Sequence, residues 1–156
     1  MAVDEGYVHR EVMDLAVAPD RVREFVLTPE RILDYYPDPV EGGVFEAGRA
    51  IWCRGGMGVS MLERLDESTD DCLVVLVTTA VGLLPPYTPE AIRDAATFTM
   101  IEEWAVVAEE AGATLTKTWR DVLADGEPSP PLAAIVREAA QGERDALVSR
   151  WNAAAG

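Results

Sequence analysis

A glutamate and a lysine in the second half of the chain, Glu102 and Lys117, have side chains suited to acid–base chemistry. Each interrupts an alternating apolar stretch, and residues 109–112 between the two stretches are typical of a hairpin turn. If the turn is even in length, Glu102 pairs with Trp119 and Lys117 pairs with Trp104, in diagonal contact with Glu102. The face that carries Glu102 is the more apolar one, so we expect it to point inward.

A carboxylate on an apolar inner face is costly to bury unless it is paired or hydrogen-bonded. Burial raises its pKa, a nearby ammonium lowers it, and such a group suits proton transfer on a carbonyl substrate. We therefore expect Glu102 and Lys117 to form the polar part of a pocket. The competing interpretation is a structural ion pair, or a position of Glu102 at a sheet edge. A hairpin slip of one residue would turn the whole set outward.

A second hairpin supplies further candidates. Gly55-Gly56 has the composition of a two-residue turn. A turn there pairs Trp52 with Val59 and Arg54 with Met57. Both side chains would then join the same pocket.

Glu63 also interrupts an apolar stripe, which it shares with Met61 and Leu65. The predicted catalytic residues are Glu102, Lys117 and Glu63. Aromatic rings offer stacking area for a planar ligand. The predicted ligand-binding residues are Tyr35, Trp52, Arg54, Met61, Met100, Trp104 and Trp119.

A metal site is not expected from the residue types. The chain has a single histidine, His9, and two cysteines, Cys53 and Cys72, which lie far apart in the sequence. No Cys–His pair that would activate a thiol is visible. His9 and Glu11 are expected to continue the apolar face of the first strand.

The helices and strands that position these residues can be predicted in chain order. Residues 7–17 alternate as a strand, and two short helices follow, each started by a proline at position 19 or 29. Residues 40–122 contain about six strand-like stretches separated by turns. A proline-rich segment at 128–131 then introduces a long amphipathic helix that reaches the C-terminus.

Two stretches are the most specific parts of this order, residues 15–32 (LAVAPDRVREFVLTPERI) and residues 112–119 (GATLTKTW). With them, the chain resembles the helix-grip superfamily (SRPBCC), which includes START lipid-transfer domains, birch-pollen-type allergens and bacterial polyketide cyclase/dehydratases. Where the family usually has a tryptophan after the second helix, this chain has Tyr35-Tyr36-Pro37.

The resemblance implies an α+β fold, in which a curved antiparallel sheet of six to seven strands wraps on the long C-terminal helix. Two short helices follow the first strand, and residues 1–156 form one ligand-binding domain with a cavity between sheet and helix.

The resemblance also implies two functions. The first is a cofactor-independent enzyme of the cyclase/dehydratase kind, acting on a polyketide-like or other apolar carbonyl compound. The alternative is a non-catalytic binding, carrier or resistance protein for a hydrophobic small molecule. An interaction protein of toxin–antitoxin or chaperone-like type stays open as a third class. An enzyme should present at least two ionisable groups to one ligand.

The length and net charge of the chain limit the classes of partner that it can bind. The chain has 156 residues, the size of one domain, and a formal net charge of -15. Such a charge repels nucleic acid and anionic membranes, so neither is expected as a stable partner. The N-terminus lacks the pattern of a signal peptide and no stretch of about 20 apolar residues occurs. We expect a cytoplasmic monomer or homodimer that binds a hydrophobic small molecule.

Overall fold

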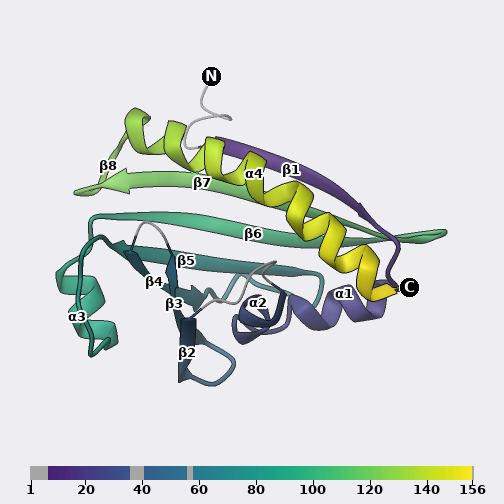
Figure 1. The fold of residues 1–156 in the computed structure, drawn as a ribbon, viewed down its shortest axis with the longest axis horizontal. Coiled ribbons are helices and arrows are strands. Elements are labelled where there is room, and N and C mark those ends of the chain that lie inside the picture. The colour runs from purple at the N-terminus through teal and green to yellow at the C-terminus, as the bar shows by residue number, and fades with distance from the viewer. Residues whose placement is uncertain (1–6, 36–40, 56–57, 156) are drawn as a thin grey trace.

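The structure is a computed structural model that describes residues 7–35, 41–55 and 58–155. Within these ranges, strands and three short helices precede one long C-terminal helix (Figure 1). In chain order the elements are β1 (Tyr7–Leu15), α1 (Pro19–Phe25), α2 (Glu30–Tyr35), β2 (Glu41–Glu46), β3 (Ala50–Gly55), β4 (Gly58–Arg64), β5 (Cys72–Ala80), α3 (Pro89–Asp94), β6 (Phe98–Glu109), β7 (Gly112–Ala124), β8 (Glu127–Pro128) and α4 (Pro130–Ala155).

The strands form one antiparallel sheet in the order β1-β7-β6-β5-β4-β3-β2, with β8 paired to β7. Figure 1 shows α4 lying along β1 and β7, with α1 and α2 near its C-terminal end. The predicted α+β helix-grip architecture is confirmed, including the two short helices after the first strand. The two-residue strand β8 was not predicted, because two residues carry no periodicity.

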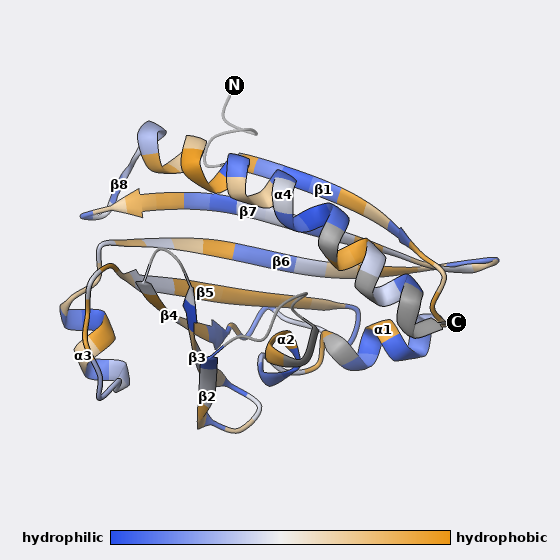
Figure 2. Ribbon diagram, viewed as in Figure 1, coloured by the Kyte–Doolittle hydropathy of each residue, from blue (hydrophilic) through white to orange (hydrophobic). Residues whose placement is uncertain are grey.

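The inner face of the sheet packs against α4. On β6, the buried residues Phe98, Glu102, Trp104 and Val106 alternate with partly exposed ones, as the sequence predicts. Strand β5 is hydrophobic along most of its length (Figure 2), which is typical of a central strand covered on both faces. The buried side chains of α4 are Val136, Ala140, Leu147 and Trp151.

Polar side chains of α4 also hold the free edge of β1. The Arg137 guanidinium donates to the Val8 carbonyl at 3.1 and 3.2 Å. Seven residues later, about two helical turns along α4, Arg144 donates to the Val12 carbonyl at 3.3 Å. These contacts satisfy carbonyls that an edge strand would otherwise leave to water or to another chain.

The β3–β4 hairpin differs from the prediction. Trp52 pairs with Met61, and Arg54 pairs with Val59. The predicted partners of Trp52 and Arg54, Val59 and Met57, are therefore wrong by a shift of two residues.

The cause is the position of the turn. The last pair is Gly55 with Gly58, one residue later on each strand than a Gly55-Gly56 turn requires, and residues 56–57 lie outside the described residues. Gly58 has a φ of +129°, and a Cβ there would lie 2.6 Å from the Ala80 carbonyl oxygen. This glycine is needed for close packing against β5, a requirement that the sequence does not distinguish from a turn.

Gly142 lies inside α4, and a Cβ added there would meet no heavy atom within 4 Å. Alanine restricts the unfolded chain more than glycine and favours the helix. We expect Gly142→Ala to raise the free energy of unfolding by about 0.5–1 kcal/mol, measured by urea denaturation.

Gly112→Ala is the matched comparison, because its added Cβ would contact the Leu15 carbonyl oxygen. This variant should lose stability under the same conditions. A destabilised Gly142→Ala would contradict the open space beside that position.

Candidate functional site

The β6–β7 hairpin has the predicted register. Glu102 pairs with Trp119, and Trp104 pairs with Lys117. His9 and Glu11 lie on this face too, because β1 pairs them with Trp119 and Lys117. One row of the inner face therefore carries several ionisable groups beneath α4.

Lys117 stands at the centre of this row with 0% of its side chain exposed. Its Nζ lies 2.9 Å from Glu143 Oε1 and 3.6 Å from Glu102 Oε1. The same nitrogen lies 3.9 Å from the ring centroid of Trp104 and 4.6 Å from that of Trp119. Two carboxylates and two indole faces thus replace the water that a buried ammonium loses.

Glu102 is 5% exposed, and burial raises its pKa above the usual range. The neighbouring Lys117 ammonium lowers this pKa, the Glu143 carboxylate raises it, and a hydrogen bond from Trp119 lowers it; burial is the largest of these effects. A carboxyl group in this state keeps its proton to a higher pH than an exposed glutamate, and is a stronger base once ionised.

A cavity of about 170 Å³ lies beside this group, between the sheet and α4. The carboxyl-bearing residues Glu102 and Glu143 both line it, and Ser60 and Thr79 add hydroxyls that lie 2.8 Å apart. The rest of its lining is apolar: Phe98, Met100, Trp119, Val136, Ala139 and Ala140. The predicted hollow under the long helix is present, and it holds two ionisable groups.

Cys53 lies close to the same network but is not a nucleophile. It pairs with Ser60, which puts it on the inner face. Burial, followed by the charge of Glu102, raises the pKa of its thiol to about 12. The thiol is therefore neutral at physiological pH.

A second group of polar contacts lies next to Lys117. The His9 Nε2 atom is 2.7 Å from Glu11 Oε1, and Arg144 Nε is 3.2 Å from Glu11 Oε2. The His9 and Trp119 ring centroids lie 5.7 Å apart. The Arg144–Glu11 contact joins α4 to β1, and none of these three residues lines the cavity described above.

Two predicted residues, Glu63 and Met61, do not reach this site. Glu102 pairs with Val75, and Val75 pairs with Arg64, so Arg64 is on the inner side. Glu63 and Met61 therefore point to the outer face of the sheet. Their predicted convergence with Glu102 is wrong.

Trp52 and Arg54 are corrected in the same way, because they pair with Met61 and Val59 on the outer face. The Trp52 ring lies against Tyr87, with centroids 4.9 Å apart. Neither side chain faces the cavity under α4.

The error has a physical cause. Helix α3 covers the outer face of β4, where Ile92 packs with Met61 and Arg93 Nη2 lies 3.0 Å from Glu63 Oε2. Both faces of this hairpin are therefore apolar, and alternation identifies which residues share a face but not which face is inward.

Of the other predicted ligand-binding residues, Met100 and Trp119 line the cavity, whereas Trp104 packs behind Lys117 in the core. The side chain of Tyr35 lies outside the described residues.

Sequence reasoning missed Glu143. This residue lies seven positions after Val136 and four before Leu147, both of them buried. That spacing places it on the buried stripe of α4, so the helical period could have identified it.

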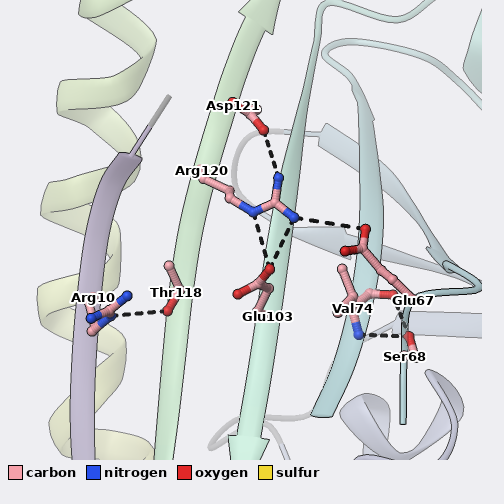
Figure 3. A network of polar contacts seen from close by, with 8 residues as sticks. All are labelled: Arg10, Glu67, Ser68, Val74, Glu103, Thr118, Arg120 and Asp121. Carbon is pink, nitrogen blue, oxygen red and sulfur yellow. Dashed lines mark hydrogen bonds and ion pairs between the residues drawn. The ribbon is translucent and has the colours of Figure 1, made fainter. Parts of the chain in front are cut away.

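The outer face carries a polar network instead. Arg120 Nη2 lies 3.0 Å from Glu103 Oε1 and 3.9 Å from Glu67 Oε1, and Arg120 Nη1 lies 2.8 Å from Asp121 Oδ2 (Figure 3). Glu103 and Arg120 are each about 30% exposed, so these pairs are screened by water and contribute little stability. We assign this network to the solvated surface of the sheet.

No helix in the described ranges has the length and apolar character needed to cross a membrane. Among the same residues, no three His, Cys, Asp or Glu side chains gather as a metal site would require.

Comparison of this chain with known proteins gives matches to solved structures but none to curated sequences. No protein-family model and no curated protein sequence matches it. A START superfamily protein from Mycobacterium smegmatis aligns over 94% of this chain and 97% of its own, with 13% identity and a TM-score of 0.62. The Mll3558 protein from Rhizobium loti aligns over 91% and 93%, with 19% identity and a TM-score of 0.56.

A third solved structure is DynU16, a protein of the dynemicin biosynthetic locus. It aligns over 90% of this chain and 45% of its own, with 16% identity and a TM-score of 0.58. Such identities show the fold alone. The chain therefore has the START-like helix-grip fold, as its sequence predicts.

The raised pKa of Glu102 has a consequence for stability. A carboxyl whose folded-state pKa lies above 4.5 binds more protons when folded, so its contribution falls as the pH rises above that value. The glutamine side chain of Glu102→Gln cannot ionise, so the variant does not lose stability in this way as the pH rises. We expect the stability of Glu102→Gln, relative to that of the unmodified protein, to increase as the pH rises from 4 to 8. Thermal denaturation of both proteins across this pH range measures the difference.

Glu138→Gln is the control, because Glu138 lies on the exposed side of α4 and its loss changes the net charge equally. A stability difference between Glu102→Gln and the unmodified protein that stays flat or shrinks as the pH rises would contradict the assigned direction.

Proposed function

We propose, from the START-like fold and the cavity under α4, that this protein binds a compact hydrophobic molecule and performs acid–base chemistry on it through Glu102. The observation that supports both parts is that Glu102 and Glu143 line one cavity whose other walls are largely apolar. Two ionisable groups directed at one ligand are the arrangement expected of an enzyme rather than of a simple carrier.

The size of the cavity limits the ligand. An apolar cavity of about 150 Å³ holds benzene, and pockets for drug-sized ligands have about 300–1,000 Å³. At about 170 Å³, this cavity suits a single substituted ring. We therefore propose a one-ring carbonyl compound as substrate, in place of the larger polyketide that the family resemblance suggests.

In the proposed reaction, the ionised Glu102 carboxylate accepts a proton from the carbon next to the substrate carbonyl. The electrons of that C–H bond move to the carbonyl oxygen, which accepts a hydrogen bond from the hydroxyl of Ser60 or Thr79. Glu102 then returns the proton to carbon, or gives it to a departing hydroxyl group. The walls around these groups are largely apolar, and no cofactor is needed for proton transfer of this kind.

A non-catalytic binding protein is the second candidate. It is favoured by the contacts of the carboxylates themselves, because Glu143 lies 2.9 Å from Lys117 and Glu102 accepts a hydrogen bond from Trp119. In that case the cluster of Glu102, Glu143 and Lys117 would be structural, and the cavity would serve only to hold the ligand.

The remaining family-based expectations belong to this proposal. They are one ligand-binding domain over residues 1–156, a cytoplasmic location and a cofactor-independent reaction of the cyclase/dehydratase kind. DynU16, which shares the fold, belongs to a biosynthetic locus, and a role in natural-product chemistry is part of the same proposal.

Binding is tested with toluene, a one-ring probe, added to protein carrying ¹³C-labelled methyl groups. We expect the methyl resonances of Met100 and Ala140 to shift, since both residues line the cavity. Ala140→Phe, at a buried position of the lining, should fill the cavity and reduce the affinity read from Met100 at least about tenfold, the effect of losing most of the apolar contact area. Ala134→Phe, at an exposed position on the same helix, should retain binding. Unmoved Met100 and Ala140 methyls would refute the binding site.

Chemistry is tested with acetophenone in D₂O, where proton abstraction replaces methyl hydrogens by deuterium. General base catalysis contributes about 10²–10⁴-fold, so we expect exchange at least about 10²-fold above buffer. Glu102→Gln should abolish the enhancement, whereas Glu138→Gln should retain it. Toluene binding without any accelerated exchange would instead support the non-catalytic candidate.

A further inference from the structure

The charged groups that face the cavity are of one sign. Glu102 and Glu143 line it, and none of the lining residues that the structure describes is a lysine, arginine or histidine. An anion that entered would meet two carboxyl groups and no cation at the cavity surface.

Lys117 does not alter this conclusion, although it is close by. Its side chain is fully buried and does not belong to the cavity lining. The ammonium is already surrounded by Glu143, Glu102 and two indole rings at the distances given above. Releasing it toward a ligand would leave the carboxylates uncompensated in the protein interior, which is strongly unfavourable.

The carboxylates, by contrast, have acceptor capacity left. A carboxylate offers about four acceptor positions, and Lys117 takes one of those on Glu143. Glu102 and Glu143 approach the cavity from opposite walls, one from β6 and one from α4. A donor group on the ligand can therefore interact with both, while its ring packs against Trp119 and Phe98.

We propose that the cavity selects one-ring ligands with a hydrogen-bond-donating head group, with a protonated primary amine preferred, a hydroxyl next and a carboxylate rejected. This inference rests on the proposed function and narrows the ligand class of the same site. It separates the protein from a carrier of fatty acids or other carboxylates.

The test compares three probes of equal ring size at pH 7 and 150 mM salt: benzylamine, benzyl alcohol and benzoate. Affinity is measured from the Met100 and Ala140 methyl resonances, so that binding elsewhere on the acidic surface is not counted. A charge-assisted hydrogen bond is about twice as strong as a neutral one, and we expect benzylamine to bind about tenfold tighter than benzyl alcohol. Benzoate should bind at least about tenfold more weakly than benzyl alcohol.

Glu143→Gln removes one cavity carboxylate, and it should reduce the preference for benzylamine over benzyl alcohol to within about threefold. Glu138→Gln changes the net charge equally from the exposed side of α4 and should keep the full preference. The order of affinities of the three probes for the unmodified protein tests the proposed preference even if Glu143→Gln fails to fold.

Benzoate binding as tightly as benzylamine would overturn this inference while leaving the proposed binding site intact. Benzylamine that shifts only resonances outside the cavity would overturn it too. Failure of all three probes and of toluene to move the cavity methyls would overturn the proposed function itself.

Discussion

The organisation of this site depends on one buried ammonium group. Lys117 is enclosed in the interior, and an unpaired charge there would cost several kcal/mol. Its Nζ therefore requires Glu102 from the sheet and Glu143 from α4 within 3.6 Å and 2.9 Å, respectively. This pairing connects the helix to the sheet at mid-length and holds two carboxyl groups at the edge of a cavity whose remaining lining is apolar except for two hydroxyls.

The size and polarity of the cavity follow from what fills the rest of the interior. Toward the C-terminal end of α4, Trp151 and Leu147 pack with Met13, Leu115 and Trp104 in one continuous core, so little space is left there. The hollow occurs beside Phe98 and Val136, where the helix carries the small residues Ala139 and Ala140. The START-like fold places the helix across the sheet, whereas these side chains determine the size and polarity of the space left beneath it. The proposed chemistry depends on the same residues, since burial raises the pKa of Glu102.

The sequence predicts this arrangement where its periodicity is long and one-sided. The β6–β7 register follows from alternation over a dozen residues on each strand, and it places Glu102 beside Trp119 and Lys117 correctly. The β3–β4 hairpin differs from the prediction in two separate ways. Glycines at 55, 56 and 58 permit more than one turn, so the pairing is shifted by two residues, which leaves each side chain on the same face as its predicted partners. The wrong face for Trp52 and Glu63 has another cause, because α3 makes the outer face apolar too. Glu143 was missed because the apolar stripe of α4 was traced through its hydrophobic residues alone, although a charged residue can share it when a buried partner is present.

The central claim, that burial beside Lys117 raises the pKa of Glu102, is tested most directly by ¹³C NMR of the glutamate side-chain carboxyl carbons as a function of pH. The resonance of Glu102 is assigned by its disappearance in Glu102→Gln. The structure predicts an apparent midpoint above the ordinary value of 4.5, and a further rise when Lys117 is replaced by methionine. A midpoint at or below 4.5 in the unmodified protein would mean that Glu102 is an ordinary ionised partner of Lys117, and would contradict the account.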